Sequence, residues 1–346
     1  MKNILIIQNI IPHYREKLYD ELSKNYSVTV LHSGKKVSNS NIRIKELIVK
    51  KYKLGPFYWQ NGVIKEVRSN NYDIIIAMFD IRWITNLFAM YQNNKSIQFI
   101  WWGPWLTNRP IIDYIKIIIS KKNYPIIFYS KYEKEKFIRK GVSKKKLFVA
   151  NNTIHVEKRI PSFNNKTKNS ILFVGSLTQR KKVDKLIYIF KNILDFIPKE
   201  VCLKIIGDGK EKNKFKKIVD DLGIQDKVYF FDEIIDDNLA YYYETAIITC
   251  SLGQAGLSIL QSFAYGVPFL TEKNAISGGE ISNIKNGYNG ILCDNDKSIS
   301  ESLIWICNNL NDSRKLGENA YKYYSEFCTI QKMVNGFNSA INFYNE

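Results

Sequence analysis

The stretch SLGQAGLSILQSFAYGVPFL occupies Ser251–Leu270 and contains the loop, the helix and the start of the second strand of one strand-to-helix-to-strand unit. It follows an apolar run at Ile247–Cys250 that is typical of a buried strand. A helix is predicted to begin near Gly256 and to end at Gly266-Val-Pro268, where the next strand starts. From spacing alone, an ordinary tight turn before a core helix is one interpretation. An anion site is the other, formed by the free N–H groups at the helix start, those of Gly256, Leu257 and Ser258.

The same alternation of short apolar runs and helical patterns fills the chain. Strands are predicted in the first half at Ile4–Ile7, Val28–His32, Ile74–Met78, Ile97–Trp101, Ile126–Tyr129 and Leu147–Ala150, and in the second half at Ile171–Val174, Leu203–Ile206, Val228–Phe231, Ile247–Cys250, Phe269–Thr271 and Ile291–Cys293. Because strand–helix alternation produces parallel sheets, we predict an α/β protein with two Rossmann-like, doubly wound domains that face a cleft.

Length and linker composition predict where these domains divide. The chain has 346 residues, which suits two domains. The stretch Ser162–Asn169 is polar and has no periodicity, so we take it as the linker. The predicted domains are 1–163 and 164–329, followed by a C-terminal helix in 330–346 that could pack on either domain.

The net charge of +18 is confined to the first part of the chain. Residues 1–165 contain 29 basic and 11 acidic residues, whereas residues 166–346 contain 22 of each. This asymmetry predicts a basic domain with an anionic partner and a neutral domain with a different one. A basic nucleic-acid-binding protein is an alternative, but no RNP-like, zinc or helix-turn-helix signature is present, so we expect no nucleic acid.

Cysteine use and hydropathy indicate the compartment. The five cysteines are odd in number, lie only in the second half and form no CxxC pair, which indicates buried thiols in a reducing cytosol. The first apolar run breaks at Gln8-Asn9, so it is interpreted as a strand rather than a signal peptide. The uncharged 27 residues of Thr245–Thr271 are interrupted by glycine and proline, which excludes a spanning helix.

At this point the sequence resembles a known family. Ser251–Leu270 looks like the C-terminal signature of family 4 retaining nucleotide-sugar glycosyltransferases, which have the two-domain GT-B fold. Phe173–Ile187, Leu203–Gly209 and Gly287–Leu292 resemble other parts of the donor domain, and Gly141–Ile154 resembles the strand leading to the linker. Gln8–Arg15 is similar to the start of a branch that acts in surface polysaccharide assembly.

The resemblance implies retaining transfer of a sugar from a nucleotide diphospho-sugar to a glycan acceptor. The acceptor is expected to be a lipid-linked oligosaccharide of O-antigen or capsule synthesis, with no cofactor and no metal. A cytoplasmic enzyme, peripheral at the inner face of the plasma membrane, is expected. The alternatives are a catalytically degenerate partner or regulatory subunit with the GT-B fold, and a sugar epimerase or phosphorylase of that fold.

The resemblance assigns donor residues in the second domain. The family's diphosphate-gripping lysine matches Lys181, whereas its arginine falls on Ser176, so Arg180 is the expected substitute. Two family glutamates, eight residues apart, fall on Gly253 and Gln261. The Gln261 amide can hydrogen-bond a ribose hydroxyl. Two further candidates stand near the lost sugar-side carboxylate, Gln254 and Glu280.

Candidates for the acceptor lie in the first domain. His13 follows the first strand next to Arg15 and could act on an acceptor hydroxyl or pair with a phosphate, or simply start a helix. The family's histidine after the fourth strand is replaced here by IWWGPWLT at residues 100–107. Trp102 and Trp105 could stack on a sugar or pack in the core.

An isoleucine stripe lies within Ile111–Lys122, formed by Ile111, Ile112, Ile115, Ile118 and Ile119. This spacing is more typical of a core helix than of a membrane anchor. The lysines around it, and the basic set from Lys131 to Lys146, suit an anionic membrane surface.

Overall fold

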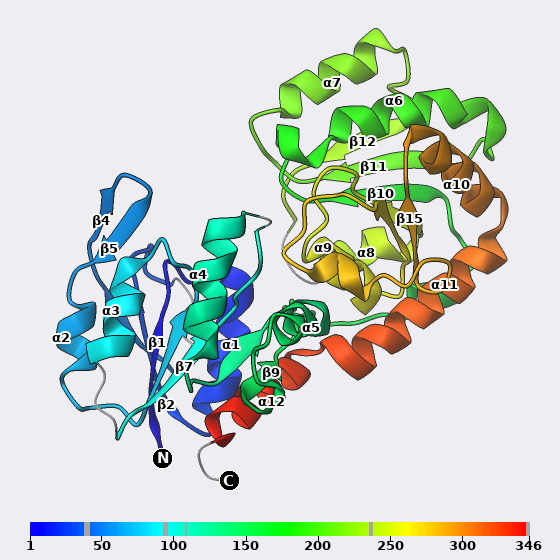
Figure 1. The fold of residues 1–346 in the computed structure, drawn as a ribbon. Helices are drawn as coiled ribbons and strands as arrows, with labels where there is room; N and C mark the ends of the chain where they lie inside the picture. The colour runs from blue at the N-terminus through cyan, green and yellow to red at the C-terminus, as the bar shows by residue number, and fades with distance from the viewer. Residues whose placement is uncertain (38–41, 93–95, 108, 235–237, 344–346) are drawn as a thin grey trace. The chain divides into compact units, whose positions relative to one another are not determined.

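The computed structural model describes residues 1–37, 42–92, 96–107, 109–234 and 238–343, which form two compact units (Figure 1). Unit 1 contains Met1–Thr153 with Ile330–Glu346, and unit 2 contains Ile154–Thr329. Residues 154–163, which the sequence analysis places in the first domain, therefore lie in unit 2. The reason is local packing, because the Ser162 N–H donates to the Tyr265 carbonyl at 3.1 Å and the Phe163 ring contacts Tyr321.

A parallel seven-stranded sheet forms the centre of unit 1, in the order β3-β2-β1-β6-β7-β8-β9. The strands are β1 (Asn3–Ile7), β2 (Ser27–His32), β3 (Lys45–Ile48), β6 (Ile74–Met78), β7 (Gln98–Trp102), β8 (Ile126–Phe128) and β9 (Leu147–Val149). The six predicted strands are confirmed to within a residue at each end. Prediction missed β3 and an antiparallel hairpin of β4 (Lys51–Leu54) and β5 (Phe57–Gln60), which are largely solvent-exposed.

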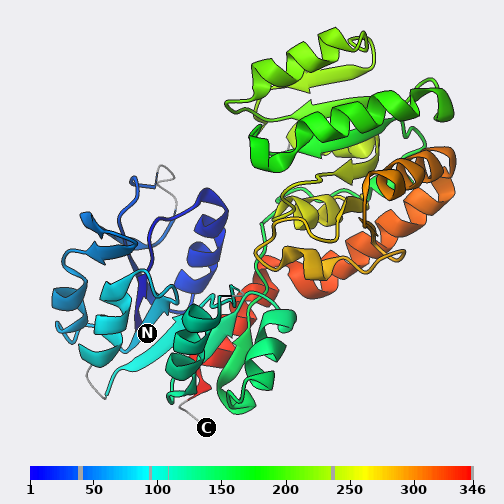
Figure 2. The same cartoon turned by 45° about the horizontal axis from the view of Figure 1, so that its top comes forward.

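Helices cover both faces of this sheet, as a parallel sheet requires. The helices of unit 1 are α1 (His13–Ser23), α2 (Val63–Val67), α3 (Ile84–Gln92), α4 (Pro110–Lys121), α5 (Lys131–Arg139) and α12 (Ile330–Ile341). Ile4 and Ile6 of β1 pack with α1 and α12, whereas Leu5 and Ile7 belong to the core under α2 to α5. The last helix α12 thus joins unit 1, beside β9 and α1, and Figures 1 and 2 show it there in red.

Unit 2 repeats the plan with six parallel strands in the order β12-β11-β10-β13-β14-β15. The strands are β10 (Ser170–Val174), β11 (Cys202–Ile206), β12 (Val228–Phe231), β13 (Ala246–Cys250), β14 (Phe269–Glu272) and β15 (Gly290–Cys293). The helices are α6 (Val183–Ile193), α7 (Lys212–Asp221), α8 (Leu239–Glu244), α9 (Ser258–Ala264), α10 (Asp296–Asn308) and α11 (Leu310–Tyr323). All six predicted strands of the second half are confirmed.

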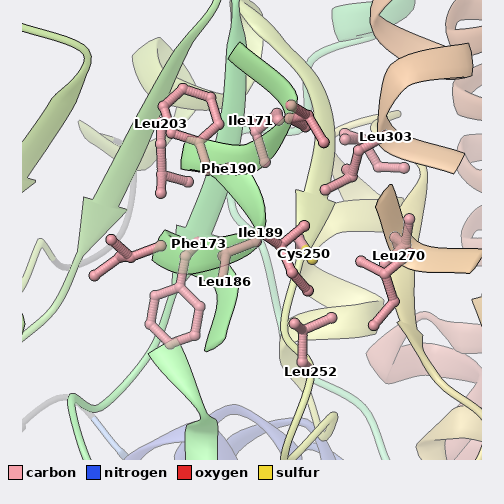
Figure 3. Packing of buried hydrophobic residues seen from close by; sticks show 14 of the residues in the cluster. Ile171, Phe173, Leu186, Ile189, Phe190, Leu203, Cys250, Leu252, Leu270 and Leu303 are labelled. Atoms are coloured by element: carbon pink, nitrogen blue, oxygen red, sulfur yellow. The ribbon is translucent and has the colours of Figure 1, made fainter. Parts of the chain in front are cut away.

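The core of unit 2 is built from alternating strand residues. Ile171 and Phe173 face α6 and α10, and Leu172 faces the opposite layer. Figure 3 shows this packing, in which Leu186, Ile189 and Phe190 of α6 lie against the sheet. Four of the five free cysteines are buried and Cys202 is half-buried, which agrees with the expectation of buried thiols.

Two expectations for unit 1 are wrong. Ile111, Ile115 and Ile118 of α4 are exposed rather than core, because the helix turns Lys116 inward in their place. Within the basic set, Lys146 is buried and donates to the Lys122 carbonyl, so it is not at the surface. In the described ranges, no helix combines the length and the apolar character needed to cross a membrane.

Candidate functional site

The loops after β10, β11 and β13 meet at the carboxyl edge of the unit 2 sheet. The loop after β10 binds the loop after β11 backbone to backbone, with the Leu177 N–H donating to the Asp208 carbonyl at 2.8 Å. A Cβ at Gly207 would lie 2.0 Å from the Gly175 carbonyl oxygen, so only glycine allows this approach. The two loops therefore form one fixed wall beside the start of α9.

The loop after β13 closes on the other side of this wall. The Gly253 N–H donates to the Lys181 carbonyl at 3.3 Å. A Cβ at Gly253 would lie only 2.2 Å from the Arg180 carbonyl oxygen. The position where the resembling family carries a glutamate therefore has no room for a side chain while residues 179–182 hold their place. The sequence shows the lost carboxylate, and the structure supplies a steric reason for it.

Lys181 lies where these loops converge. Its Nζ donates to the Gln254 carbonyl at 3.0 Å, and its chain passes over Gly175. Burial lowers the pKa of Lys181 below its ordinary value, Arg180 lowers it further, and Glu280 opposes this shift. Arg180 itself points to solvent. The structure thus brings together Lys181, Gln254 and Glu280, and it leaves Arg180 and Ser176 exposed on the same loop.

Glu280 is a fixed, buried carboxylate rather than a mobile surface group. Its Oε2 accepts hydrogen bonds from the Gly278 N–H at 2.8 Å and from the Ser277 hydroxyl at 3.1 Å. Its loop is joined to the β13 loop by two hydrogen bonds of 3.0 Å. The Ile276 N–H donates to the Gly253 carbonyl, and the Ile276 carbonyl accepts from the Ala255 N–H. Glu280 therefore belongs structurally to the site of Lys181.

The start of α9 offers unused donors next to Lys181. Among the described residues, no acceptor is found for the N–H groups of Gly256, Leu257 and Ser258. The buried hydroxyls of Ser258 and Thr178 also have no hydrogen-bond partner there. Gly256 is open on its Cβ side, and Gln261 is half-buried one turn into the helix. Unpartnered polar groups around a lysine are suited to an anionic ligand.

The acceptor candidates of unit 1 differ in their surroundings. His13 is exposed as the first residue of α1. Arg15 is only 3% exposed, and its guanidinium lies 5.0–5.2 Å from the ring centres of Tyr14, Trp102 and Tyr129. It also binds Asn152 and donates to the Met333 sulfur at 3.2 Å.

Trp102 is 1% exposed and packs edge-on against Phe337 of α12. Its packing interpretation therefore fits this structure, and the stacking interpretation does not, because its ring has no free face. The same holds for Arg15, which the surrounding rings enclose. Both residues serve the interior of unit 1 instead of presenting a surface to an acceptor.

Trp105 remains exposed, on a loop that α4 and α5 hold in place. Lys116 Nζ donates to the Trp105 carbonyl at 2.7 Å and lies 4.8 Å from its ring centre. Asp113 accepts from the Thr107 N–H and hydroxyl, and Glu133 accepts weakly from the Leu106 N–H. Trp105 is thus a fixed aromatic side chain at the carboxyl edge of the unit 1 sheet.

Sequence reasoning missed three polar groups at these edges. Thr178 lies inside Phe173–Ile187, one of the segments that resemble the donor domain of the family, and could have been found there. Asp80 and Arg82 form a multiply bonded ion pair just after β6, and Arg82 keeps 57% of its side chain exposed. Among the described residues, no cluster of three His, Cys, Asp or Glu side chains has the arrangement of a metal site.

The chain is similar to known proteins over much of its length. Residues 156–323 match the protein family described as glycosyl transferases group 1. The chain is 27% identical over 259 residues to an uncharacterised glycosyltransferase of Haemophilus influenzae, covering 71% of this chain and 70% of that protein. It is 26% identical over 256 residues to an uncharacterised 41.2 kDa protein in the cps region of Klebsiella pneumoniae, covering 66% and 67%.

Solved structures share the whole architecture. The Anabaena protein HepE in complex with UDP superposes with a TM-score of 0.76 at 14% identity, covering 99% of this chain and 100% of that one. The apo form of the lipopolysaccharide outer core galactosyltransferase WaaB gives a TM-score of 0.73 at 17% identity, with both chains covered completely. The fold is that of the GT-B class, with two Rossmann-like domains. Residues 156–323, which lie within unit 2, are therefore similar to group 1 glycosyl transferases, and the whole chain shares its fold with the solved structures.

Proposed function

We propose that the protein transfers a sugar, with retention, from a nucleotide diphospho-sugar to a lipid-linked glycan of surface polysaccharide synthesis. The observation that carries this proposal is the position of Lys181 among the unpartnered donors at the start of α9. Two similar proteins support it: HepE was solved with UDP and with UDP-glucose, and the Klebsiella relative lies in a cps region.

In this proposal unit 2 holds the donor. The Lys181 ammonium and the N–H groups of Gly256–Ser258 bind the diphosphate, and the Gln261 amide binds a ribose hydroxyl. As the bond between the anomeric carbon and the phosphate oxygen breaks, its electron pair goes to the diphosphate, where these donors stabilise the growing charge. The acceptor oxygen bonds to the anomeric carbon, and its proton passes to the leaving phosphate.

Neither a metal nor a cofactor is invoked in this mechanism, since Lys181 and the backbone donors supply the positive potential. His13 is proposed as a group near the acceptor, and Trp105 as its aromatic contact. Membrane association and a cytoplasmic location belong to the same proposal, because a lipid-linked acceptor is reached at the inner face of the membrane.

The test is release of nucleoside diphosphate from a panel of nucleotide-sugars. Lys181→Met should lower turnover by more than about tenfold, because the leaving diphosphate loses the partly buried ammonium that lies beside the start of α9. Because burial lowers the pKa of Lys181, the affinity of the wild type for UDP should fall with rising pH earlier than for an ordinary lysine. That fall should be absent in Lys181→Met.

The matched control is Lys191→Met, which removes an exposed lysine of α6 in the same unit. Equal turnover in both variants would remove Lys181 from the site. The closed position at Gly253 favours one second candidate, a catalytically inactive partner subunit of this fold. That protein would bind UDP and release none from any nucleotide-sugar in the panel.

A further inference from the structure

Helix α4 buries a lysine and leaves several isoleucines exposed, since its buried residues are Lys116, Ile117, Ile119 and Ser120. Surface helices of globular proteins turn apolar residues inward and lysines outward. Here Lys116 is 3% exposed, with its amine bonded inside to the Trp105 carbonyl, whereas Ile111 is 77% exposed. Burial lowers the pKa of Lys116, and Asp113 and Asp80 oppose that shift. The helix thus keeps a charged group inside and leaves large apolar groups in water, so another surface must cover them.

The exposed apolar surface continues onto α3. The two helices both pack on the Leu5/Ile7 side of the sheet, and Figure 1 shows them as neighbours. Their ends are joined by Lys122, whose Nζ donates to the Tyr91 hydroxyl at 2.9 Å and lies 4.4 Å from its ring centre. We call this surface the α3–α4 face; its exposed members are Phe88, Tyr91, Ile111, Tyr114, Ile115 and Ile118.

Charge selects what can cover this face. Arg109, Lys121 and Lys122 stand at the ends of α4. Helix α3 has no acidic residue, and the one acid of α4, Asp113, is engaged by Thr107. Residues 1–153 contain 27 basic and 10 acidic residues. A second copy of this chain would therefore bring like charge to like charge, whereas an anionic bilayer combines an apolar interior with negative headgroups.

We propose that the α3–α4 face docks on an anionic phospholipid bilayer. Ile111, Tyr114 and Ile118 enter the boundary between headgroups and acyl chains, and the flanking lysines and arginine meet lipid phosphates. This inference deepens the proposed function and rests on it for the identity of the acceptor. It also moves the membrane contact away from the Lys144–Lys146 segment, where Lys146 is committed to the interior.

The test measures sedimentation of the full chain with vesicles. Wild type should bind vesicles of phosphatidylglycerol and phosphatidylcholine at least about tenfold more tightly than vesicles of phosphatidylcholine alone, at about 0.1 M salt. The double variant Ile111→Glu/Ile118→Glu should lose at least about tenfold in affinity for the anionic vesicles, because it removes apolar contacts and adds repulsion. The matched control is Tyr188→Glu/Phe196→Glu, which makes the same charge change at exposed apolar residues of unit 2.

Retained binding in Ile111→Glu/Ile118→Glu would overturn the proposal, and so would an equal loss in both double variants or a wild type that binds no vesicle. A wild-type dimer that the α4 variant separates, without vesicle binding, would assign the face to a second copy instead. The thermal shift with UDP should be the same in wild type and both variants, which shows that they fold. If no nucleotide-sugar turns over but vesicle binding still depends on α4, the proposed function fails and the docking face stands.

Discussion

The two units share one plan and differ at the edge where their strands end. In unit 2 the loops meet backbone to backbone, through Gly207 against Gly175 and Gly253 against Arg180. In unit 1 side chains fill the corresponding edge: a Cβ at Gly103 would lie 2.6 Å from the Tyr129 ring, and Arg15 is enclosed by three rings. The comparison teaches that the parallel sheet only supplies the edge. In unit 2, close contacts at glycines shape the edge into a site suited to an anion. In unit 1, aromatic packing closes the corresponding edge.

The largest expected effect is a loss of stability that is confined to unit 1. Phe337→Ala removes a fully buried ring whose centre lies 5.0 Å from that of Trp102, and it should lower the free energy of unfolding of unit 1 by about 3–5 kcal/mol. Hydrogen exchange should accelerate in peptides of residues 1–153, while peptides of residues 170–270 keep their rates. Equal acceleration in both sets would mean that the units unfold as one.

The next effect compares a glycine of unit 2 that has no room for a Cβ, Gly253, with one that has open space, Gly256. Gly253→Ala places a methyl group 2.2 Å from the Arg180 carbonyl and must displace the loop that carries Lys181. We expect at least a tenfold loss of UDP affinity, about 1.4 kcal/mol, measured by calorimetry. Gly256→Ala is the control, because its Cβ would meet nothing within 4 Å. If Gly253→Ala binds UDP as well as Gly256→Ala does, the close contact between Gly253 and the Arg180 carbonyl does not position Lys181.

A third comparison concerns two buried lysines, one in each unit. Burial and nearby Arg314 lower the pKa of Lys168 in unit 2 to about 7, with Glu244 opposing. In the unfolded chain the pKa is ordinary, near 10.5. Between these values the unfolded state binds more protons, so stability rises with pH, by at most about 1.4 kcal/mol per pH unit.

Lys168→Met should therefore flatten the rise in urea midpoint of unit 2 between about pH 7 and pH 10. The matched variant in unit 1 is Lys116→Met, which removes a lysine whose lowered pKa is opposed by three carboxylates, those of Asp113, Asp80 and Glu133. Its effect on the slope should be smaller. An unchanged slope in Lys168→Met would show that this amine stays protonated in the folded state.

Sequence patterns predicted the strands well, and they predicted poorly how side chains are arranged at the carboxyl edges of the sheets. Runs such as Ile74–Met78 are apolar at every position, so both faces had to be buried and a parallel strand followed. The spacing of the isoleucines predicted the helix α4 but not which of its faces is buried. That face depends on Lys116, whose amine finds an acceptor at the Trp105 carbonyl, eleven residues away. Likewise, Gly253 looked like a missing carboxylate, since no one-dimensional pattern shows a carbonyl 2.2 Å from an absent side chain.

Lys181, Ser258 and Glu280 could be found because they lie close to strand ends in recognisable motifs. Trp102 and Arg15 were harder, since an aromatic or cationic residue after a strand fits a ligand or the interior equally well. What settles them is the final helix, which brings Phe337 and Met333 beside them from more than two hundred residues away. Contacts of that separation have no local signature.

That final helix has a consequence for the order of folding during synthesis. Met333, Phe337 and Ile341 are core residues of unit 1, yet the ribosome makes them after every residue of unit 2. Unit 2 therefore has its complete core available first, reversing the usual order in which the N-terminal domain folds first. Until α12 emerges, only α1 covers the Ile4/Ile6 side of the unit 1 sheet, so apolar residues on that side stay open to chaperones and proteases.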